Sequence, residues 1–204
     1  MACGALTEAH AIGLIHRDIK PANIMLCTQG GERDVVKLLD FGLVKDLQVE
    51  RDVAVSGTST LTGTPQYMAP ECILEPDSVD VRTDIYALGA VAYYLLAGSE
   101  VFGGKSVIEV FSQHIHELPD SFAARGVTIA PELEAIVQSC LDKQPARRPQ
   151  TAAELRRRLE ACLVDAWDGD HAQRWWLEHQ GAIDADARPS AGDVRTLAID
   201  GAPR

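Results

Sequence analysis

The fold of this chain is decided by one stretch of its sequence, which reads His16-Arg17-Asp18-Ile19-Lys20-Pro21-Ala22-Asn23. Two shorter motifs follow it in the chain, Asp40-Phe41-Gly42 and Ala69-Pro70-Glu71. The five defined positions of the first motif arise by chance in a chain of 204 residues only about once in ten thousand sequences. The three motifs in this order therefore indicate a specific architecture and not a coincidence of loop residues.

Hydrophobic periodicity around these motifs predicts a mainly helical chain with one β-hairpin. Apolar residues at helical spacing predict a helix within residues 2–15. Two β-rich runs, Asn23–Leu26 and Val35–Leu39, are separated by a polar turn that contains glycine, which predicts the hairpin. Four further helices are expected, at Asp84–Ala97, Ser106–His116, Pro131–Leu141 and Thr151–Leu163.

The composition changes after residue 163, which predicts two regions. Residues 1–163 are expected to form one lobe, and residues 164–204 an acidic, tryptophan-containing tail that is partly disordered. The tail holds the chain's three tryptophans, Trp167, Trp175 and Trp176. Their rings could cover part of the lobe or bind a partner. Packing on the lobe is favoured, because aromatic side chains carry large buried areas.

Charge and cysteine content exclude several classes of function. The chain holds 30 acidic against 19 basic residues, a net charge of -11, whereas a nucleic-acid-binding surface needs clustered Lys and Arg. The apolar runs are too short to cross a bilayer. Five scattered cysteines without a CxxC pair argue against a disulfide framework or a zinc site. We therefore expect a cytoplasmic protein with no nucleic-acid partner and no membrane segment in this chain.

The three motifs together resemble the signature of protein kinases, namely the HRDxKxxN catalytic loop, the DFG metal-binding turn and the APE end of the activation segment. The resemblance covers about residues 1–162 and implies the family's C-terminal lobe, mainly α with a short β-hairpin at the catalytic loop, without the N-terminal β lobe. Lys20 after Asp18, together with residues 63–71, is similar to the serine/threonine type. The activation segment resembles that of the bacterial, eukaryotic-like branch.

This resemblance implies a site for ATP and Mg²⁺ built from four residues. Asp18 would orient the substrate hydroxyl and accept its proton, and Lys20 would place a positive charge against the transferring phosphate. Asn23 and Asp40 would supply oxygen ligands to Mg²⁺, a hard ion that prefers oxygen. The hairpin between these two residues would bring together ligands that stand 17 positions apart.

Five further positions match residues that support the site in kinases. Asp84 matches the helix carboxylate that braces the backbone of the catalytic loop, and Arg148 matches the arginine that pairs with Glu71. Partners of this kind are costly to remove when they are buried. His16 and Phe41 match packing residues below the site, so the resemblance implies that neither is an acid or a base.

The activation segment carries the remaining family positions. Gly42 completes the metal-binding turn, and Thr64 lies in the substrate-binding loop. Arg17 resembles the arginine of the kinase class whose basic pocket receives a phosphate from this segment, and such a pair would order the loop. The candidate phosphorylation sites are Thr58, Ser59, Thr60 and Thr62. A loop that is merely polar is an equally good interpretation of these four residues.

Two hypotheses about function follow. The sequence has no GxGxxG loop, and the expected helix before His16 begins almost at Met1, which leaves no room for the small lobe. In the first hypothesis the chain is part of a kinase that transfers the γ-phosphate of ATP to Ser/Thr hydroxyls of proteins, including a second copy of itself. In the second it is a non-catalytic binding or regulatory module. The intact set of Asp18, Lys20, Asn23 and Asp40 favours the first, and the chain by itself is expected to be inactive.

Overall fold

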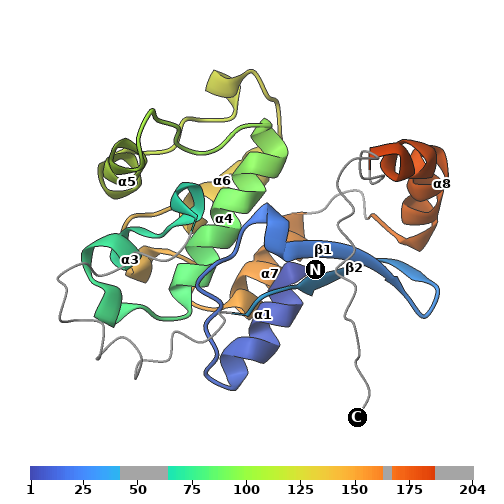
Figure 1. Cartoon of the computed structure of the whole chain (residues 1–204), viewed down its shortest axis with the longest axis horizontal. Helices are drawn as coiled ribbons and strands as arrows, with labels where there is room; N and C mark the ends of the chain where they lie inside the picture. The colour runs from blue at the N-terminus through green and yellow to red at the C-terminus, as the bar shows by residue number, and fades with distance from the viewer. Residues whose placement is uncertain (42–63, 163–166, 187–204) are drawn as a thin grey trace, which may run out of the picture.

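The computed structural model of the chain describes residues 1–41, 64–162 and 167–186. Helix α4 (Arg82–Ala97) runs through the middle of a helical lobe, and a β-hairpin extends from the edge of this lobe toward helix α8 (Figure 1). The other helices are α1 (Ala2–Ala11), α3 (Pro70–Leu74), α5 (Val107–His116), α6 (Pro131–Cys140), α7 (Ala152–Cys162) and α8 (Gly169–Asp186). Short 3₁₀ turns are η1 (Pro21–Asn23), η3 (Pro65–Tyr67), η4 (Pro76–Ser78), η5 (Ala123–Arg125) and η6 (Pro145–Arg147).

Helix α4 is the centre of the hydrophobic core. One side of it contributes Tyr86 and Tyr93 to a cluster that also holds Phe122 and Leu141. Gly89 lets α4 approach α6 closely, because a Cβ atom at this position would lie 2.5 Å from the Cβ of Cys140. The core therefore holds α4 rigidly, and the residues near its N-terminal end become fixed points for the loops around them.

The β-hairpin joins the two halves of the expected site. Strand β1 (Ile24–Gln29) pairs in antiparallel fashion with β2 (Glu32–Leu38), and Ile24 stands opposite Leu38 at the base of the hairpin. The two strands are longer at the turn than the sequence pattern predicts, because the polar residues on both sides of Gly30 continue the ladder. The hairpin itself is confirmed.

The expected helices of the lobe are present. The first ends at Ala11, short of the expected limit at residue 15, because the chain reverses at Gly13, and the ends of the other four differ by one or two residues from the predicted bounds. Thr151 directly precedes α7, and its hydroxyl accepts a hydrogen bond from the amide of Glu154 at 3.0 Å, as expected of a capping residue. Helix α8 lies in the region expected to form the acidic tail, where no helix is predicted from the sequence. The division of the chain at residue 163 stays a prediction.

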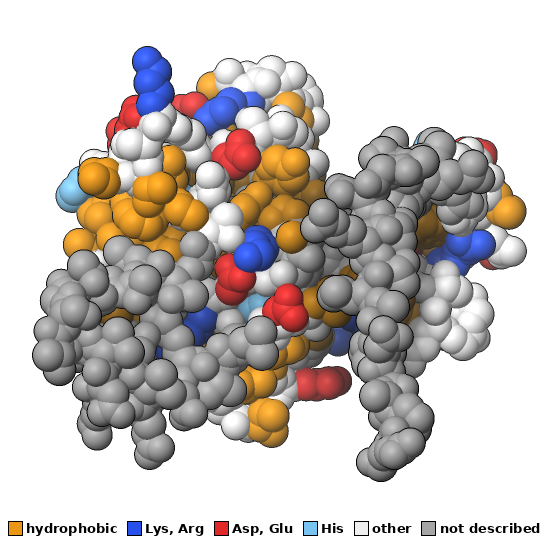
Figure 2. Space-filling model, viewed as in Figure 1, with side chains coloured by type: hydrophobic (Ala, Val, Ile, Leu, Met, Phe, Trp, Pro, Cys, Tyr) orange, Lys and Arg blue, Asp and Glu red, His pale blue; other side chains and the backbone are white. Residues whose placement is uncertain are grey.

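The surface of the described residues is mixed in character. Figure 2 shows hydrophobic side chains gathered over the region of α5, where Val107 and Ile108 are exposed, beside Lys, Arg, Asp and Glu side chains. Met25 and Leu26 on β1 are about half exposed, at 47% and 53%. Among the helices that the structure describes, none combines the length and the apolar character required to span a bilayer.

Candidate active site

The chain enters the candidate site through a tight reversal at the end of α1. The amide of Gly13 donates to the carbonyl of His10 at 3.0 Å, and the amide of Leu14 donates to the carbonyl of Ala9 at 3.0 Å. This pair of bonds is a Schellman motif, and Gly13 takes the left-handed conformation it requires, with φ of 77°. The reversal directs residues 14–23 back across the N-terminal part of α4.

Asp84 of α4 holds the backbone of the catalytic loop. Its carboxylate accepts the amides of His16 and Arg17, at 2.8 and 2.9 Å, and its side chain is fully buried. Arg17 has a φ of 65°, an uncommon conformation for a residue with a Cβ. Two charge-assisted hydrogen bonds to adjacent amides fix the loop in that conformation. The structure thus places Asp84 where the sequence resemblance expects a brace.

His10 is a further partner of Asp84 that the sequence reasoning missed. Its Nε2 donates to the same carboxylate oxygen that accepts the amide of His16, at 2.8 Å. The one indication in the sequence is that a second histidine, His10, stands six residues before His16, on the helix that leads into the catalytic loop. Without the Schellman reversal, however, nothing in the sequence pattern shows that these two histidines approach the same carboxylate.

His16 links the catalytic loop to the end of the hairpin. Its Nε2 donates to the carbonyl of Leu39 at 2.9 Å, its Nδ1 accepts the amide of Asp18 at 3.4 Å, and its ring packs against Phe41 with centroids 4.7 Å apart. Both ring nitrogens are therefore engaged by backbone groups within a buried setting. His16 and Phe41 occupy packing positions, and neither is placed to exchange a proton with a substrate.

Asp18, Lys20 and Asn23 converge at the surface of the lobe. Lys20 Nζ donates to Asp18 Oδ2 at 2.6 Å. Asn23 Nδ2 donates to the main-chain carbonyl of Asp18 at 2.8 Å and to Oδ2 at 3.2 Å. The side chains of Asp18 and Lys20 remain 31% and 27% exposed, whereas Asn23 is buried. The carboxylate is thus oriented by two donors on one oxygen and stays accessible from solvent.

Asn23 and Asp40 flank the base of the hairpin. The amide of Leu39 donates to the carbonyl of Asn23 at 2.8 Å, which places the next residue, Asp40, beside Asn23. Among the described residues, both hydrogen bonds of the Asn23 side chain use its nitrogen, which leaves its amide oxygen to bind a cation. An amide oxygen and a carboxylate form a donor set that suits Mg²⁺ together with phosphate oxygens. Within residues 1–41, 64–162 and 167–186 no group of three or more His, Cys, Asp and Glu forms a metal cage of its own.

The expected substrate-binding loop, which begins at Thr64, lies beside the catalytic loop. A small cavity between the two is lined by Asp18, Thr64, Tyr67 and Cys72, among others. Burial, with a smaller contribution from the nearby Glu71 carboxylate, raises the pKa of the Cys72 thiol to about 11, so this thiol stays protonated and is a poor nucleophile. The cavity therefore brings Thr64 next to Asp18 without adding a second reactive group.

Glu71 and Arg148 form a buried ion pair below this loop. The guanidinium donates two bonds to the carboxylate, at 2.6 and 2.7 Å, and a third from Nε to the carbonyl of Asp142 at 2.8 Å. Thr83 at the start of α4 also donates to Glu71, at 2.9 Å. The pair expected from the sequence is present and ties α3 to α4 and to the segment before α7.

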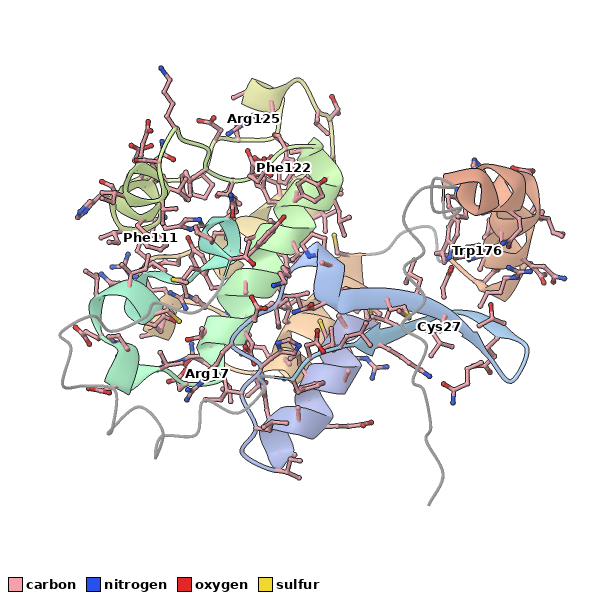
Figure 3. All side chains as sticks on the ribbon, in the orientation of Figure 1. Arg17, Cys27, Phe111, Phe122, Arg125 and Trp176 are labelled. Carbon is pink, nitrogen blue, oxygen red and sulfur yellow. The ribbon has the colours of Figure 1, made fainter. Side chains whose placement is uncertain are left out.

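The remaining expected site residues are Arg17, which the structure describes, and five residues that it does not describe. Arg17 has an exposed side chain and is labelled in Figure 3. Gly42 and the candidate phosphorylation sites Thr58, Ser59, Thr60 and Thr62 lie outside the described residues. The turn after Phe41 and the phosphate pocket around Arg17 therefore stay predictions.

The sequence matches the family described as "Protein kinase domain" over residues 2–159. The chain belongs to the protein kinase family, as the three motifs predict. The family generally uses ATP and Mg²⁺ and acts on protein substrates.

Relatives narrow the class to bacterial serine/threonine kinases. The serine/threonine-protein kinase PknB of Mycolicibacterium smegmatis is 42% identical over 155 residues, which cover 76% of this chain and 24% of that protein. PknB of Mycobacterium tuberculosis is 42% identical over 169 residues, with 83% and 25% covered. A probable serine/threonine-protein kinase of Streptomyces coelicolor is 40% identical over 159 residues, with 78% and 23% covered. The chain spans about a quarter of the length of these relatives.

A solved structure supports the fold. The crystal structure of Rad53 1-466 in complex with AMP-PNP is similar with a TM-score of 0.57 and 27% sequence identity, over 76% of this chain and 36% of that chain. The expected fold class, a mainly helical kinase-like lobe with one hairpin, is confirmed by this likeness and by the family match.

Proposed function

We propose that this chain is the catalytic lobe of a serine/threonine protein kinase, which transfers the γ-phosphate of ATP to hydroxyl groups of proteins. The observation that carries the proposal is the orientation of Asp18 by Lys20 and Asn23, together with the position of Asp40 beside Asn23 at the hairpin base. ATP would supply the phosphoryl group, and the bound Mg²⁺ would neutralise the negative charge of its phosphate oxygens. The residues of the chain supply alignment and electrostatic stabilisation, which are the main needs of this reaction.

Each residue has a proposed role that follows from its contacts. The two donors that reach the Asp18 carboxylate within the described part of the chain bind Oδ2, so Oδ1 is the oxygen that would orient an acceptor hydroxyl and take its proton. Lys20 would move its charge from Asp18 toward the transferring phosphate as that phosphate approaches. Asn23 and Asp40 would hold Mg²⁺ through their oxygens.

The acceptor would bind along the loop that begins at Thr64. This loop lies beside Asp18 and is held from below by the Glu71–Arg148 pair, so its position relative to Asp18 is defined by a buried contact. Lys20 and the relatives support Ser/Thr over Tyr as the acceptor. Phosphorylation of the segment that holds Thr58–Thr62, by a second copy of the protein, would bring phosphate to Arg17. Because the proposed reaction consumes ATP, we expect it to take place in the cytoplasm.

The proposal is tested in a fused kinase, in which the glycine-rich small lobe of a serine/threonine kinase is joined before residue 1 of this chain. The chain alone has no glycine-rich loop and is expected to transfer no phosphate. The fused kinase is expected to phosphorylate a generic acceptor protein with Mg·ATP, and hydrolysis of the product should yield phosphoserine and phosphothreonine. A folded fusion that binds Mg·ATP and transfers nothing, or that yields phosphotyrosine, would contradict the proposal. The first of these outcomes would favour a binding or regulatory module.

A further inference from the structure

One carboxylate of the hairpin binds two tryptophans of the segment that contains helix α8. The indole Nε1 of Trp176 donates to Asp34 Oδ1 at 2.6 Å, and the indole Nε1 of Trp167 donates to Asp34 Oδ2 at 2.7 Å. The two oxygens of one side chain thus bind two tryptophans that lie 142 and 133 positions further along the chain. Hydrogen bonds to an ionised acceptor are about twice as strong as those between neutral groups.

The hairpin presents this carboxylate by means of a β-bulge. Gln29 pairs with Glu32 and Cys27 pairs with Val35, so Arg33 and Asp34 together stand opposite Thr28 alone. Asp34 has a φ of 59°, in the left-handed region that Asp tolerates better than most residues. A bulge of this kind turns a side chain out of the regular strand direction. The irregularity in β2 is what directs Asp34 toward α8.

Other contacts make this interaction a packed surface. The guanidinium of Arg33 lies over the ring of Trp176, 5.7 Å from its centroid, which adds a cation–π contact to the hydrogen bonds. Ala172 of α8 is 2% exposed. Trp176 projects from the side of α8 nearest the hairpin that carries Cys27 (Figure 3), and the hairpin extends from the lobe toward α8 (Figure 1).

The hairpin links the contacts of α8 to the candidate active site. Its base carries Asn23 at one end and Asp40 at the other, and its far part carries Asp34. The family match ends at residue 159, so Trp167 and Trp176 lie beyond the kinase domain itself. We propose that Asp34, Trp167 and Trp176 form a hairpin clasp, by which the segment after the kinase domain holds the β1–β2 hairpin and thereby the spacing of its two metal-binding ends. Asp34 is a positioning residue in this account.

Tryptophan fluorescence tests the contact directly in the full chain. All three tryptophans of the protein lie in this segment, and two of them, Trp167 and Trp176, bond to Asp34, so a change in tryptophan emission that follows a substitution at Asp34 reports on the clasp. Asp34→Asn keeps a residue that tolerates the left-handed conformation, but it turns one acceptor into a donor that faces an indole N–H. The matched control is Glu32→Gln, an exposed carboxylate on the same hairpin. Asp34→Asn should shift the emission to longer wavelength and increase quenching by acrylamide, and Glu32→Gln should do neither.

Hydrogen exchange tests whether loss of the clasp loosens the base of the hairpin, where the amide of Leu39 bonds to Asn23. In Asp34→Asn the amide of Leu39, which bonds to Asn23, should exchange about tenfold faster, whereas amides in α4 and α6 keep their rates. Trp176→Phe, which keeps an aromatic ring and removes the N–H, should do the same. Unchanged emission and quenching in Asp34→Asn would overturn the clasp. Altered emission with unchanged exchange at Leu39 would overturn its positioning role.

A third measurement rests on the proposed function. In the fused kinase, Asp34→Asn should raise the Mg²⁺ concentration required for half-maximal transfer without a change in the KM for the acceptor protein. An unchanged Mg²⁺ requirement would overturn the effect on the metal site. Because fluorescence and exchange need no activity, an inactive fusion would count against the proposed function, while those two measurements still decide the clasp.

Discussion

Arg148 and Glu71 form a bidentate ion pair across 77 positions of sequence, with both donor–acceptor distances below 2.8 Å. The Arg148 side chain is fully buried, and the Glu71 side chain is 10% exposed. The guanidinium also packs over the ring of Tyr86, 4.8 Å from its centroid. The pair therefore connects α3, which follows the loop that begins at Thr64, to the central helix α4. Because both side chains are largely removed from water, each charge is stabilised mainly by the other.

Loss of one partner of this pair should destabilise the lobe strongly. Arg148→Met leaves the buried Glu71 carboxylate without its cation and is expected to lower the free energy of unfolding by about 3–5 kcal/mol. Urea unfolding followed by circular dichroism measures this. Arg147→Met, at the exposed neighbouring position, should change stability by less than about 0.5 kcal/mol. If both variants unfold at the wild-type midpoint, the pair does not stabilise the lobe.

The buried His114 should make stability depend on pH. Its ring shares a hydrogen bond of 2.7 Å with the hydroxyl of Tyr86. Burial, with a smaller contribution from the Lys143 charge, lowers the pKa of His114 from 6.5 to about 4. Between those values the unfolded chain binds the proton and the folded chain does not, so stability falls as pH drops from 6.5 to 4, by about 3 kcal/mol in total.

Variants separate this effect from general acid unfolding. In His114→Asn the loss of stability between pH 7 and pH 4.5 should be smaller than in the wild type by about 2 kcal/mol. His116→Gln removes an exposed histidine from the same helix and should leave the pH dependence unchanged. Equal pH dependence in the wild type and His114→Asn would show that His114 titrates normally in the folded protein.

Asp40 should set the metal requirement of the fused kinase. Asp40→Asn replaces the charged member of the proposed pair of Mg²⁺ ligands by a neutral amide, and the Mg²⁺ concentration for half-maximal transfer is expected to rise about tenfold or more. Asp77→Asn, an exposed carboxylate on η4, serves as the control. A wild-type metal requirement in Asp40→Asn would mean that Mg²⁺ is held elsewhere.

The sequence was sufficient to predict the fold class and most of the lobe, for identifiable reasons. The catalytic-loop motif carries side chains whose spacing leaves few alternative roles. Helices such as α5 and α6 show a clear apolar period. The Glu71–Arg148 pair was predictable only through the family resemblance, because nothing local in the chain relates two residues so far apart.

Other features could not be predicted, because they depend on three-dimensional contacts. His10 becomes a partner of Asp84 only when the reversal at Gly13 turns the chain back. Asp34 looks like an ordinary turn residue, and its role depends on a one-residue bulge and on α8. Helix α8 has a weak apolar period and many charges, so its composition indicates a solvated tail until the contacts of Trp167 and Trp176 are known.

The most direct test of the central claim is the effect of Asp18→Asn on phosphate transfer by the fused kinase, with the affinity for Mg·ATP measured in parallel. Asn keeps the size of the side chain and can no longer accept the proton of the acceptor hydroxyl. Transfer is expected to slow by about 10²–10⁴-fold, while the affinity for Mg·ATP and the unfolding midpoint stay close to the wild type. Transfer at the wild-type rate in Asp18→Asn would contradict the assignment of this loop as the catalytic centre.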